Sequence, residues 1–162
     1  MARWRKAALG VSAALAIASG PASAQNQGTA QLAVSATVQN TCSVTGGSLS
    51  FGTYTSGQSQ ALDGEGTINY ANCPAGNLTI ELDNGLNAQG TQRRMRSGNN
   101  YLSYELYKTN ARTARWGTGS EGLTYSILVG GNGSVPVYGR ILPNQLVPAG
   151  TYTDTVTITF RF

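Results

Sequence analysis

Histidine is absent from the 162 residues of this chain, and charged residues make up only 11% of it. The absence removes the usual general base and the commonest metal ligand, and it makes a Ser-His-Asp triad impossible. The chain has only two cysteines, so it also lacks the paired ligand spacing of a closed zinc site. We therefore expect a protein that is not an enzyme and that holds no metal and no cofactor.

Two remaining patterns resemble a catalytic or a phosphate-binding site, but neither is specific for such a site. Glu81 and Asp83 share one side of an expected strand and imitate a pair of catalytic carboxylates. Their strand has one apolar and one polar face, which favours a solvated strand exterior. The glycine-rich stretch Gly130–Gly133 is followed by no GK[ST] sequence and no helix start, so a hairpin turn is expected there instead of a phosphate-binding loop.

Long apolar runs are also missing, apart from a short one near the start. Arg3, Arg5 and Lys6 precede the run Ala7–Ile17, and small residues follow at Ala22–Ala24. These are the three parts of a secretory signal peptide, which we expect at residues 1–24, with export by the Sec route. Cleavage after residue 24 would leave residues 25–162, or 138 residues, enough for one ordinary domain.

The basic character of the chain largely comes from this signal. Three of its eleven Lys and Arg residues precede position 25, which leaves eight Lys and Arg against seven Asp and Glu, a net charge of +1. A nucleic-acid partner would require a basic stripe or a recognisable module, and none is expected. Arg93, Arg94 and Arg96 do cluster, and the glycines on either side favour a solvated loop.

The two cysteines are Cys42 and Cys73. In an exported chain they predict a single disulfide, since the compartment is oxidising. Closing a loop of this length should stabilise the fold by roughly 3 to 4 kcal/mol on the chain-entropy model.

Turn residues recur through the rest of the chain, between short runs that alternate apolar and polar residues. This spacing predicts an all-β sandwich. The expected strands are Gln31–Thr37, Cys42–Val44, Ser48–Phe51, Gly66–Tyr70, Leu78–Leu82, Leu102–Tyr107, Thr124–Leu128, Val135–Ile141 and Thr151–Phe162. Pro136 suggests a sheet edge or a bulge because proline cannot donate to a ladder. Residues 142–150 are expected to form a loop before the last strand.

The segment before Cys42 also alternates, with its apolar side chains at Leu32, Val34, Ala36 and Val38. Two interpretations fit. The segment could be the first strand of a self-contained sandwich, or it could be donated to another chain whose sheet lacks a strand. The last expected strand, Thr151–Phe162, has nothing after it to supply a partner, which is compatible with a missing strand.

The chain resembles the spore coat protein U domain family, which includes the Csu-type pilins of archaic chaperone-usher pathways. The resemblance is carried by a series of motifs in a specific order and spacing. They are LAVSATVQNTCSV leading into Cys42, LSFGTYTSG at Leu49–Gly57, YELYKTNARTARWG at Tyr104–Gly117, VPVYGRILPNQ at Val135–Gln145 and AGTYTDTVTITFRF at Ala149–Phe162.

This resemblance implies an incomplete immunoglobulin-like β-sandwich, spanning residues 40–162 and completed by donor-strand complementation. A periplasmic chaperone would first lend the missing strand, and an outer-membrane usher would exchange it for residues 25–39 of a neighbouring subunit. The donor side chains would be those of Leu32, Val34, Ala36 and Val38. The acceptor groove would be flanked by the first strand of the body and the C-terminal strand, and Val156, Ile158, Phe160 and Phe162 would help to line it. The Cys42–Cys73 disulfide matches the family's in placement.

The function so implied is that of a structural subunit of a surface fibre that supports adhesion or biofilm formation. The subunit would be periplasmic during assembly and would end on the cell surface. A self-contained secreted binding module and a spore-coat structural protein are the alternatives.

Overall fold

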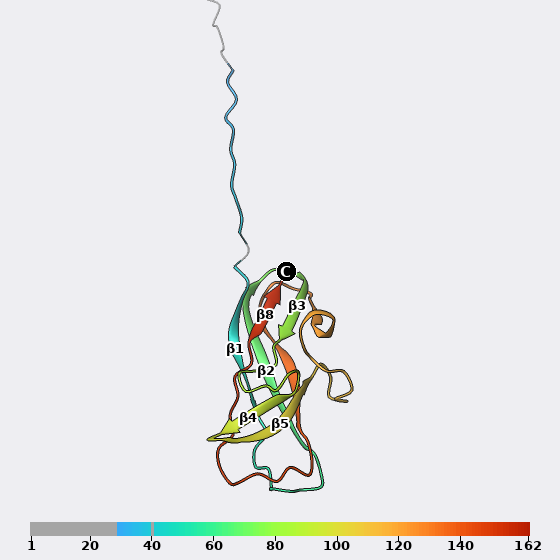
Figure 1. Cartoon of the computed structure of the whole chain (residues 1–162). Coiled ribbons are helices and arrows are strands. Elements are labelled where there is room, and N and C mark those ends of the chain that lie inside the picture. Colours follow the sequence, from blue (N-terminus) through green and yellow to red (C-terminus); the bar gives the residue numbers. More distant parts are fainter. Residues whose placement is uncertain (1–28, 40) are drawn as a thin grey trace, which may run out of the picture. The chain divides into compact units, whose positions relative to one another are not determined.

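The computed structural model describes residues 29–39 and 41–162. The expected signal peptide, and residues 25–28 and 40 of the expected donor segment and domain, lie outside the described residues. The chain divides into an N-terminal unit that ends at Thr37 and a body that begins at Val38. The body contains the strands β1 (Ser43–Ser50), β2 (Leu62–Cys73), β3 (Gly76–Leu82), β4 (Arg93–Ser97), β5 (Asn100–Tyr107), β6 (Leu123–Ile127), β7 (Gly131–Ile141) and β8 (Ile158–Arg161), with a 3₁₀ turn at Gly119–Glu121 (Figure 1).

The strands form two antiparallel sheets. The larger has the order β1-β2-β7-β5-β4 and the smaller has the order β6-β3-β8. Apolar side chains from both sheets meet between them, as the period of two in each strand requires. Leu78, Ile80 and Leu82 of β3 are buried, and so are Leu102 and Leu106 of β5. The two sheets pack as a sandwich of the immunoglobulin-like class.

The disulfide that the sequence predicts is present between Cys42 and Cys73. It joins the residue before β1 to the last residue of β2. Because β1 and β2 are also neighbours in the larger sheet, the disulfide closes this end of their ladder. We call this end of the body the disulfide pole, defined by Cys42, Cys73–Asn77, Ile127–Gly131 and Phe162.

Pro136 lies in β7, which is a central strand of the larger sheet. It faces Thr67 of β2, whereas β5 pairs with β7 only from Tyr138 to Ile141. The half of β7 that contains the proline is therefore a local edge, where the missing N–H costs no ladder hydrogen bond.

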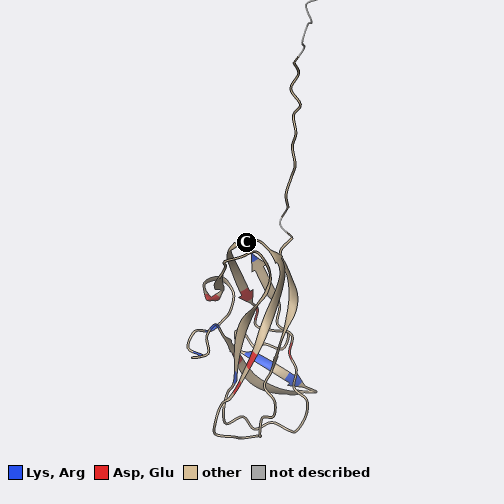
Figure 2. Ribbon diagram, turned by 180° about the vertical axis from the view of Figure 1, so that it is seen from behind, with Lys and Arg blue, Asp and Glu red and all other residues tan. Residues whose placement is uncertain are grey.

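Three sequence expectations need correction. The last strand is β8, Ile158–Arg161, which is shorter than the expected strand from Thr151; of the residues before it, Thr153 forms an isolated β-bridge to Arg96 of the larger sheet. Residues 31–37, expected as a strand, form none. Finally, the loop expected around Arg93 is the strand β4, which Figure 2 shows carrying several basic residues.

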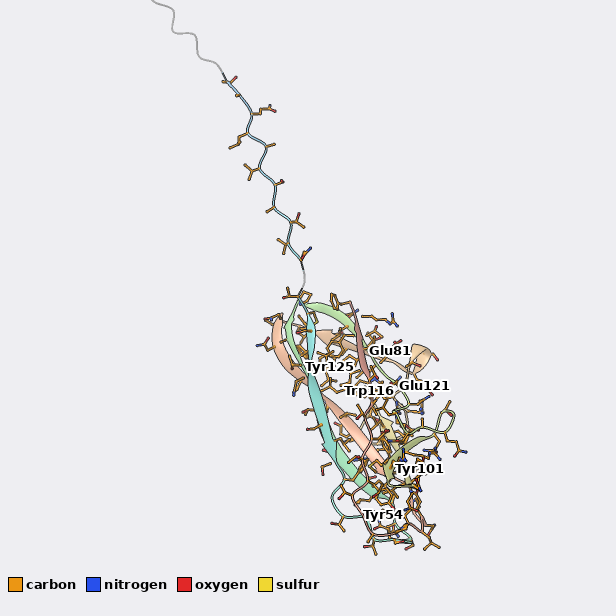
Figure 3. All side chains as sticks on the ribbon, turned by 60° about the vertical axis from the view of Figure 1, so that its left-hand side comes forward. Tyr54, Glu81, Tyr101, Trp116, Glu121 and Tyr125 are labelled. Atoms are coloured by element: carbon orange, nitrogen blue, oxygen red, sulfur yellow. A yellow bond between two sulfur atoms is a disulfide. The ribbon has the colours of Figure 1, made fainter. Side chains whose placement is uncertain are left out.

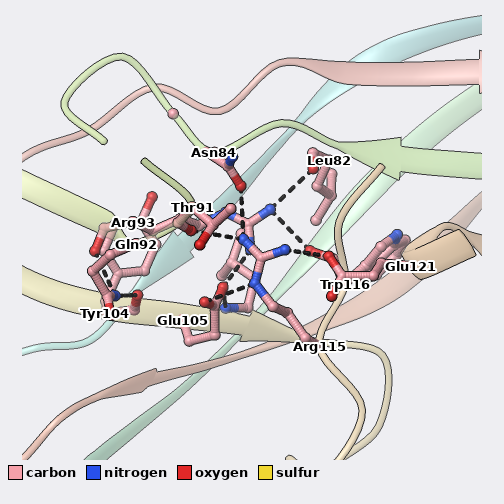
Figure 4. Close-up of polar contacts among 12 residues, drawn as sticks. Leu82, Asn84, Thr91, Gln92, Arg93, Tyr104, Glu105, Arg115, Trp116 and Glu121 are labelled. Atoms are coloured by element: carbon pink, nitrogen blue, oxygen red, sulfur yellow. Dashed lines mark hydrogen bonds and ion pairs between the residues drawn. The ribbon is translucent and has the colours of Figure 1, made fainter. Parts of the chain in front are cut away.

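Arg93 is fully buried, which is the largest departure from the solvated loop expected for it. Its guanidinium forms an ion pair with Glu105 of β5. It also donates to three backbone carbonyls, those of Leu82 (3.0 Å), Asp83 (2.9 Å from Nε) and Trp116 (2.8 Å) (Figure 4). These carbonyls lie at the end of β3 and in the connection from β5 to β6, so one side chain ties the two sheets together.

The cluster around Arg93 continues outward through a second arginine. Arg115 pairs with the other oxygen of Glu105 at 2.9 Å and with Glu121. It also donates to the side-chain oxygen of Asn84 at 2.7 Å. Among the described residues, no buried side-chain nitrogen or oxygen is left without a hydrogen-bond partner. We call Arg93, Glu105, Arg115 and Glu121 the arginine cluster.

Candidate functional site

A groove opens between β1 of the larger sheet and the extended residues 152–158, which lead into β8 of the smaller sheet. The cavity in it has a volume of about 420 Å³. One wall is formed by Gly47–Leu49 and Phe51, and the other by Tyr152–Val156 and Ile158. The groove therefore lies where the two sheets approach each other without pairing.

The floor of the groove is the hydrophobic core itself. It is formed by inward-facing side chains from five strands, namely Ile68, Leu82, Met95, Tyr104, Leu106 and Val137. In a finished domain such side chains are covered on all sides, because apolar surface exposed to water is unfavourable. Here the core is open along one line.

Backbone groups along the second wall lack partners as well. In residues 152–158 the odd-numbered residues bond away from the groove: Thr153 exchanges two hydrogen bonds with Arg96, and the carbonyl of Thr155 accepts one from Leu86. Successive residues of an extended chain direct their backbone groups to opposite edges. Within the described chain, no hydrogen bond reaches the backbone N–H or C=O of the even-numbered residues Tyr152, Asp154 and Val156.

The opposite wall, β1, has a free edge too. It pairs with β2 and with no other strand of the described chain. An antiparallel strand bonds its neighbour with alternate residues, so half of the backbone groups of β1 point away from β2. The two walls are thus two sheet edges that face one another across the cavity.

Leu49 and Phe51 fill part of the wall, and glycines in the larger sheet make room for them. A Cβ at Gly139 would stand 2.6 Å from the tip of the Phe51 ring. The same ring packs edge-on against Tyr104, with a centroid distance of 5.9 Å. A larger residue at position 139 would push Phe51 into the cavity and narrow the groove.

One polar contact interrupts the apolar lining. Asp154 accepts a hydrogen bond from the hydroxyl of Tyr104 at 2.8 Å and two from Asn87, from its backbone N–H at 3.2 Å and its side-chain amide at 3.0 Å. Gly85, with φ of +82°, lies against this carboxylate, and a side chain there would displace it. Burial, together with the hydrogen bond to Asp154, raises the pKa of Tyr104 above its ordinary value, so the phenol stays protonated and donates.

The four residues predicted to line an acceptor groove lie in three different places in the structure. Val156 and Ile158 line the cavity. Phe160 is half-buried against the core beyond the end of the cavity. Phe162 is 63% exposed and borders a second, smaller cavity at the disulfide pole. Their role in accepting a strand stays a prediction.

Several lining residues were not predicted as part of this site. Tyr152 and Asp154 share the face of Val156, so the alternation of the segment could have identified them. Leu49 and Phe51 also alternate, in the expected strand Ser48–Phe51, which the structure joins to the expected first strand of the body as β1, but neither side chain was named as part of the groove. Tyr104 could not be assigned from its own strand, because only the packing of the two sheets brings it to Asp154.

The predicted donor residues lie outside the body's core. Every residue from 29 to 39 is exposed and none is in a strand. The exposed fractions of Leu32, Val34 and Val38 are 87%, 84% and 90%. Three large apolar side chains at alternate positions are thus left in solvent by this chain alone, which is unfavourable unless another surface covers them.

Glu81 and Asp83 do not form a solvated pair. Glu81 accepts a hydrogen bond from the backbone N–H of Gly119 at 3.0 Å and pairs with Arg161 at 3.2 Å. Asp83 accepts from the N–H groups of Gly85 at 2.9 Å and Thr157 at 2.8 Å. Both carboxylates are occupied by backbone and ion-pair contacts, so the interpretation as a solvated exterior was wrong.

The electrostatics of Asp83 follow from these contacts. Burial alone would raise its pKa, but the hydrogen bonds from Thr157 and Gly85 and the nearby charge of Arg93 hold it below the ordinary value of 3.8. The ionised carboxylate thus fastens the chain at Thr157, next to the wall of the groove.

Other kinds of site were sought in residues 29–39 and 41–162. They contain no group of three or more His, Cys, Asp or Glu side chains that could hold a metal ion. No helix in this part of the chain is long and apolar enough to cross a membrane.

Comparison with known proteins gives the following relationships. Residues 28–159 match the sequence profile of the Spore Coat Protein U domain. The chain is 37% identical to Protein U of Myxococcus xanthus over 168 residues, covering 93% of each protein.

Two solved structures are also similar. The fold is similar to that of the P pilus rod subunit PapA, with a TM-score of 0.50 and 16% identity over 74% of this chain and 97% of that one. The CsuC–CsuE chaperone–tip adhesion subunit complex of the archaic Csu pili of Acinetobacter baumannii matches with a TM-score of 0.48 and 25% identity. That match covers 72% of this chain but only 39% of the other.

The profile match extends from the exposed alternating segment through both walls of the groove, and the curated relative is similar over nearly its whole length. The β-sandwich fold is similar to that of a pilus rod subunit. On this evidence the chain belongs to the Spore Coat Protein U domain family.

Proposed function

We propose that this protein is a structural subunit of a surface fibre assembled by the chaperone-usher route, in which each copy donates residues 25–39 to the groove of the next. One observation carries the proposal. The backbone groups of Tyr152, Asp154 and Val156 are unpaired and face the free edge of β1 across an apolar cavity of about 420 Å³. An extended strand placed there would bond to both edges and cover the core.

The segment that would fill the groove has matching properties. Its apolar side chains at Leu32, Val34, Ala36 and Val38 lie at every second position, as required for one side of an inserted strand, and all but Ala36 are large. Burying each would stabilise the joint by about 1.5 to 3 kcal/mol. Each ladder hydrogen bond would add about 0.5 to 1.5 kcal/mol. A joint of this kind would dissociate slowly.

The cellular route follows from the same features. The proposed signal peptide at residues 1–24 would direct export to the periplasm, and an oxidising compartment suits the Cys42–Cys73 disulfide. There a chaperone would cover the groove, whose open core would otherwise promote aggregation. An outer-membrane usher would then exchange the chaperone strand for that of the next subunit. The role is structural, in attachment or biofilm formation, with no catalytic residue.

A coat layer built by the same strand exchange is the second candidate. It is favoured by the 37% identity with Protein U over nearly the whole of both chains. The two candidates share the groove and the donor segment. They differ in whether an usher is required and in whether the assembly is a thin fibre or a layer.

The experiment compares three forms of the chain, each co-expressed with any chaperone and usher that are encoded beside it. They are the native chain, a chain lacking residues 25–39, and a chain with Gln31 and Ser35 changed to alanine as the matched control. Surface-sheared protein is run on a denaturing gel with and without boiling. We expect a ladder that collapses on boiling for the native and control chains, and no ladder for the deletion.

The deletion should still accept a strand. A synthetic peptide of residues 25–39 should bind it and raise its unfolding temperature, since ligand binding to the native state stabilises it. A deletion that still polymerises would disprove donation by this segment. A native chain that is a soluble monomer without a chaperone would favour the self-contained binding module.

A further inference from the structure

The two ends of the body carry exposed apolar side chains that the groove does not explain. At the disulfide pole, the connection between β6 and β7 holds Leu128 and Val129, which are 89% and 83% exposed. The two strands lie in different sheets, so the hairpin turn expected at Gly130–Gly133 is not formed. The connection packs against the turn between β2 and β3, since a Cβ at Gly130 would stand 3.0 Å from the carbonyl of Cys73. A cavity of about 150 Å³ lies beside it, bordered by the disulfide and Phe162.

The opposite end is formed by two long loops, residues 51–61 and 142–151, which we call the loop pole. Hydrogen bonds join them: the N–H of Gly57 donates to Gln145 at 2.8 Å, and that of Asn144 donates to Gln58 at 2.7 Å. The side chain of Leu146 lies on this end and is 86% exposed. In Figure 3, Tyr54 marks the loop pole and Tyr125 lies toward the other end of the body.

The length of chain before the disulfide limits how far apart two linked copies can lie. Only three residues lie between Val38 and Cys42, so four residue-to-residue steps join them. Four residues span at most about 14 Å. If Val38 lies in the groove of a second copy, the disulfide pole of the donor must lie near the end of that groove which holds Val38.

Side-chain size indicates which end this is. An antiparallel arrangement beside residues 152–158 places Leu32 opposite Ile158 in the open cavity and the small Ala36 opposite Asp154, whose carboxylate is already occupied by Tyr104. A parallel arrangement over the same residues would put the larger Val34 opposite Asp154 and leave the small Ala36 opposite Val156 in the open cavity. The antiparallel ladder is also slightly more stable for each residue. It brings Val38 to Tyr152, which is the loop-pole end of the groove.

We propose that the disulfide pole of each copy docks on the loop pole of the next, with Leu128 and Val129 packed near Leu146. This inference rests on the proposed strand donation, and it adds a second contact surface between neighbouring copies. The two surfaces differ, so the contact is head-to-tail and extends into an open fibre instead of closing into a pair.

The test uses cysteine pairs in the full chain, co-expressed with the chaperone and usher. The variant carries Leu128→Cys and Leu146→Cys. The controls are each single substitution, and a double variant of Leu128→Cys with Leu86→Cys, since Leu86 is 78% exposed but lies beside Thr155, away from both poles. Sheared fibres are oxidised, boiled and run without reductant, and then with reductant.

We expect a covalent ladder from the Leu128/Leu146 pair that survives boiling and collapses with reductant. Its yield should exceed that of every control by about tenfold or more, because neighbouring poles hold the thiols at millimolar effective concentration. A ladder no stronger than the controls would overturn the docking. Dimers from Leu128→Cys alone would also overturn it, because they would show two disulfide poles meeting.

A parallel measurement separates this inference from the proposed function. The unboiled, unoxidised lane reports strand donation alone. If that lane shows a non-covalent ladder but no cross-links form after oxidation, only the docking of the poles is disproved. If the native chain gives no non-covalent ladder, both the docking and the strand donation are disproved. Replacing Leu128 and Val129 with aspartate should leave the unfolding of the monomer unchanged, since both are exposed, and should make the fibres more flexible in electron micrographs. Fibres of unchanged stiffness would also count against the docking.

Discussion

The two sheets of the sandwich meet at both the arginine cluster and the groove. At the first their polar groups are paired, and at the second their backbone groups are not. At the arginine cluster, Arg93 crosses from the larger sheet and bonds the carbonyls of Leu82 and Asp83 at the end of β3. At the groove, β1 and the residues before β8 face each other with backbone groups unpaired. The contacts at the arginine cluster are therefore completed within one chain, whereas the groove requires a strand from another chain.

This difference also separates two kinds of stability. The cluster contributes to the folding of one chain, and its contacts are all present in that chain. The groove can contribute fully only after association, when a strand covers the open core. A substitution in the cluster should therefore change the monomer, and a substitution in the donor segment should change only the assembly.

The largest effect on the free energy of unfolding is expected from Arg93→Met, which removes the central side chain of the arginine cluster. It leaves Glu105 with only one of its two arginine partners, Arg115, and removes the buried donor to three backbone carbonyls. Removing one partner of a buried ion pair costs about 3 to 5 kcal/mol. Urea unfolding of the disulfide-bonded monomer measures it. The matched control is Arg94→Met, whose guanidinium stacks on the exposed ring of Tyr101 at 4.1 Å and should matter by less than about 1 kcal/mol. Equal effects of the two substitutions would contradict the difference that we draw between buried and exposed arginines.

The next largest effect concerns the groove and the donor segment that is proposed to fill it. Leu32→Ala should weaken each joint by about 1.5 to 3 kcal/mol, because less apolar surface is buried in the groove. The urea concentration at which the unboiled ladder falls apart measures this loss. Gln31→Ala, on the other side of the same strand, is the control and should leave the joint unchanged. Monomer unfolding should be the same for both, and a weaker monomer after Leu32→Ala would mean that the segment pairs within its own chain.

A smaller effect concerns the one polar contact inside the groove. Tyr104→Phe removes the hydroxyl that donates to Asp154 at 2.8 Å and keeps the packing of the ring against Phe51. A hydrogen bond of this kind contributes about 1 kcal/mol. The monomer should lose this amount in urea unfolding, and the loss should vanish in a background that already carries Asp154→Ala, which has no side-chain acceptor for the hydroxyl. An additive result would contradict the assignment.

The smallest effect is a pH dependence at Asp83. Its pKa is lower in the folded protein than its ordinary value of 3.8, so ionised Asp83 stabilises the fold above that pH, and this contribution is lost as the pH falls through the folded-state pKa. Asp83→Asn should therefore be less stable than the native chain near neutral pH by under about 1 kcal/mol. The gap should close in acid. Urea midpoints of both proteins at a series of pH values measure it, and a gap that widens toward acid would have the wrong sign.

The sequence predicted the faces of the strands better than their partners. Leu78, Ile80 and Leu82 alternate in the sequence and are buried in the structure. Residues 152–160 alternate as well, and their even-numbered side chains do turn inward. A period of two reports which side of an extended chain is apolar. It does not report whether a neighbouring strand is present, which is why the last strand was predicted to be longer than β8.

Arg93 could not be placed from its own neighbourhood. The sequence RRMRS of β4 has no apolar alternation and is flanked by glycine-containing turns, so local composition favours exposure. The carbonyls that accept its hydrogen bonds come from Leu82, Asp83 and Trp116, far from it in sequence. Their arrangement exists only in the folded domain. The same holds for the groove, which is bounded by residues about a hundred positions apart.

The position of the disulfide has a mechanical consequence for a fibre joined by donated strands. Tension along such a fibre would enter each subunit through the residues just before Cys42. Without a cross-link, the force would fall first on β1, which within its own chain pairs only with β2 and could be peeled from it one hydrogen bond after another. Because Cys42 is bonded to Cys73, the load passes directly to the end of β2, which pairs with β1 and β7 of the same chain. The covalent bond thus transfers the pull from a strand that its own chain holds by one ladder to a strand that its own chain holds by two.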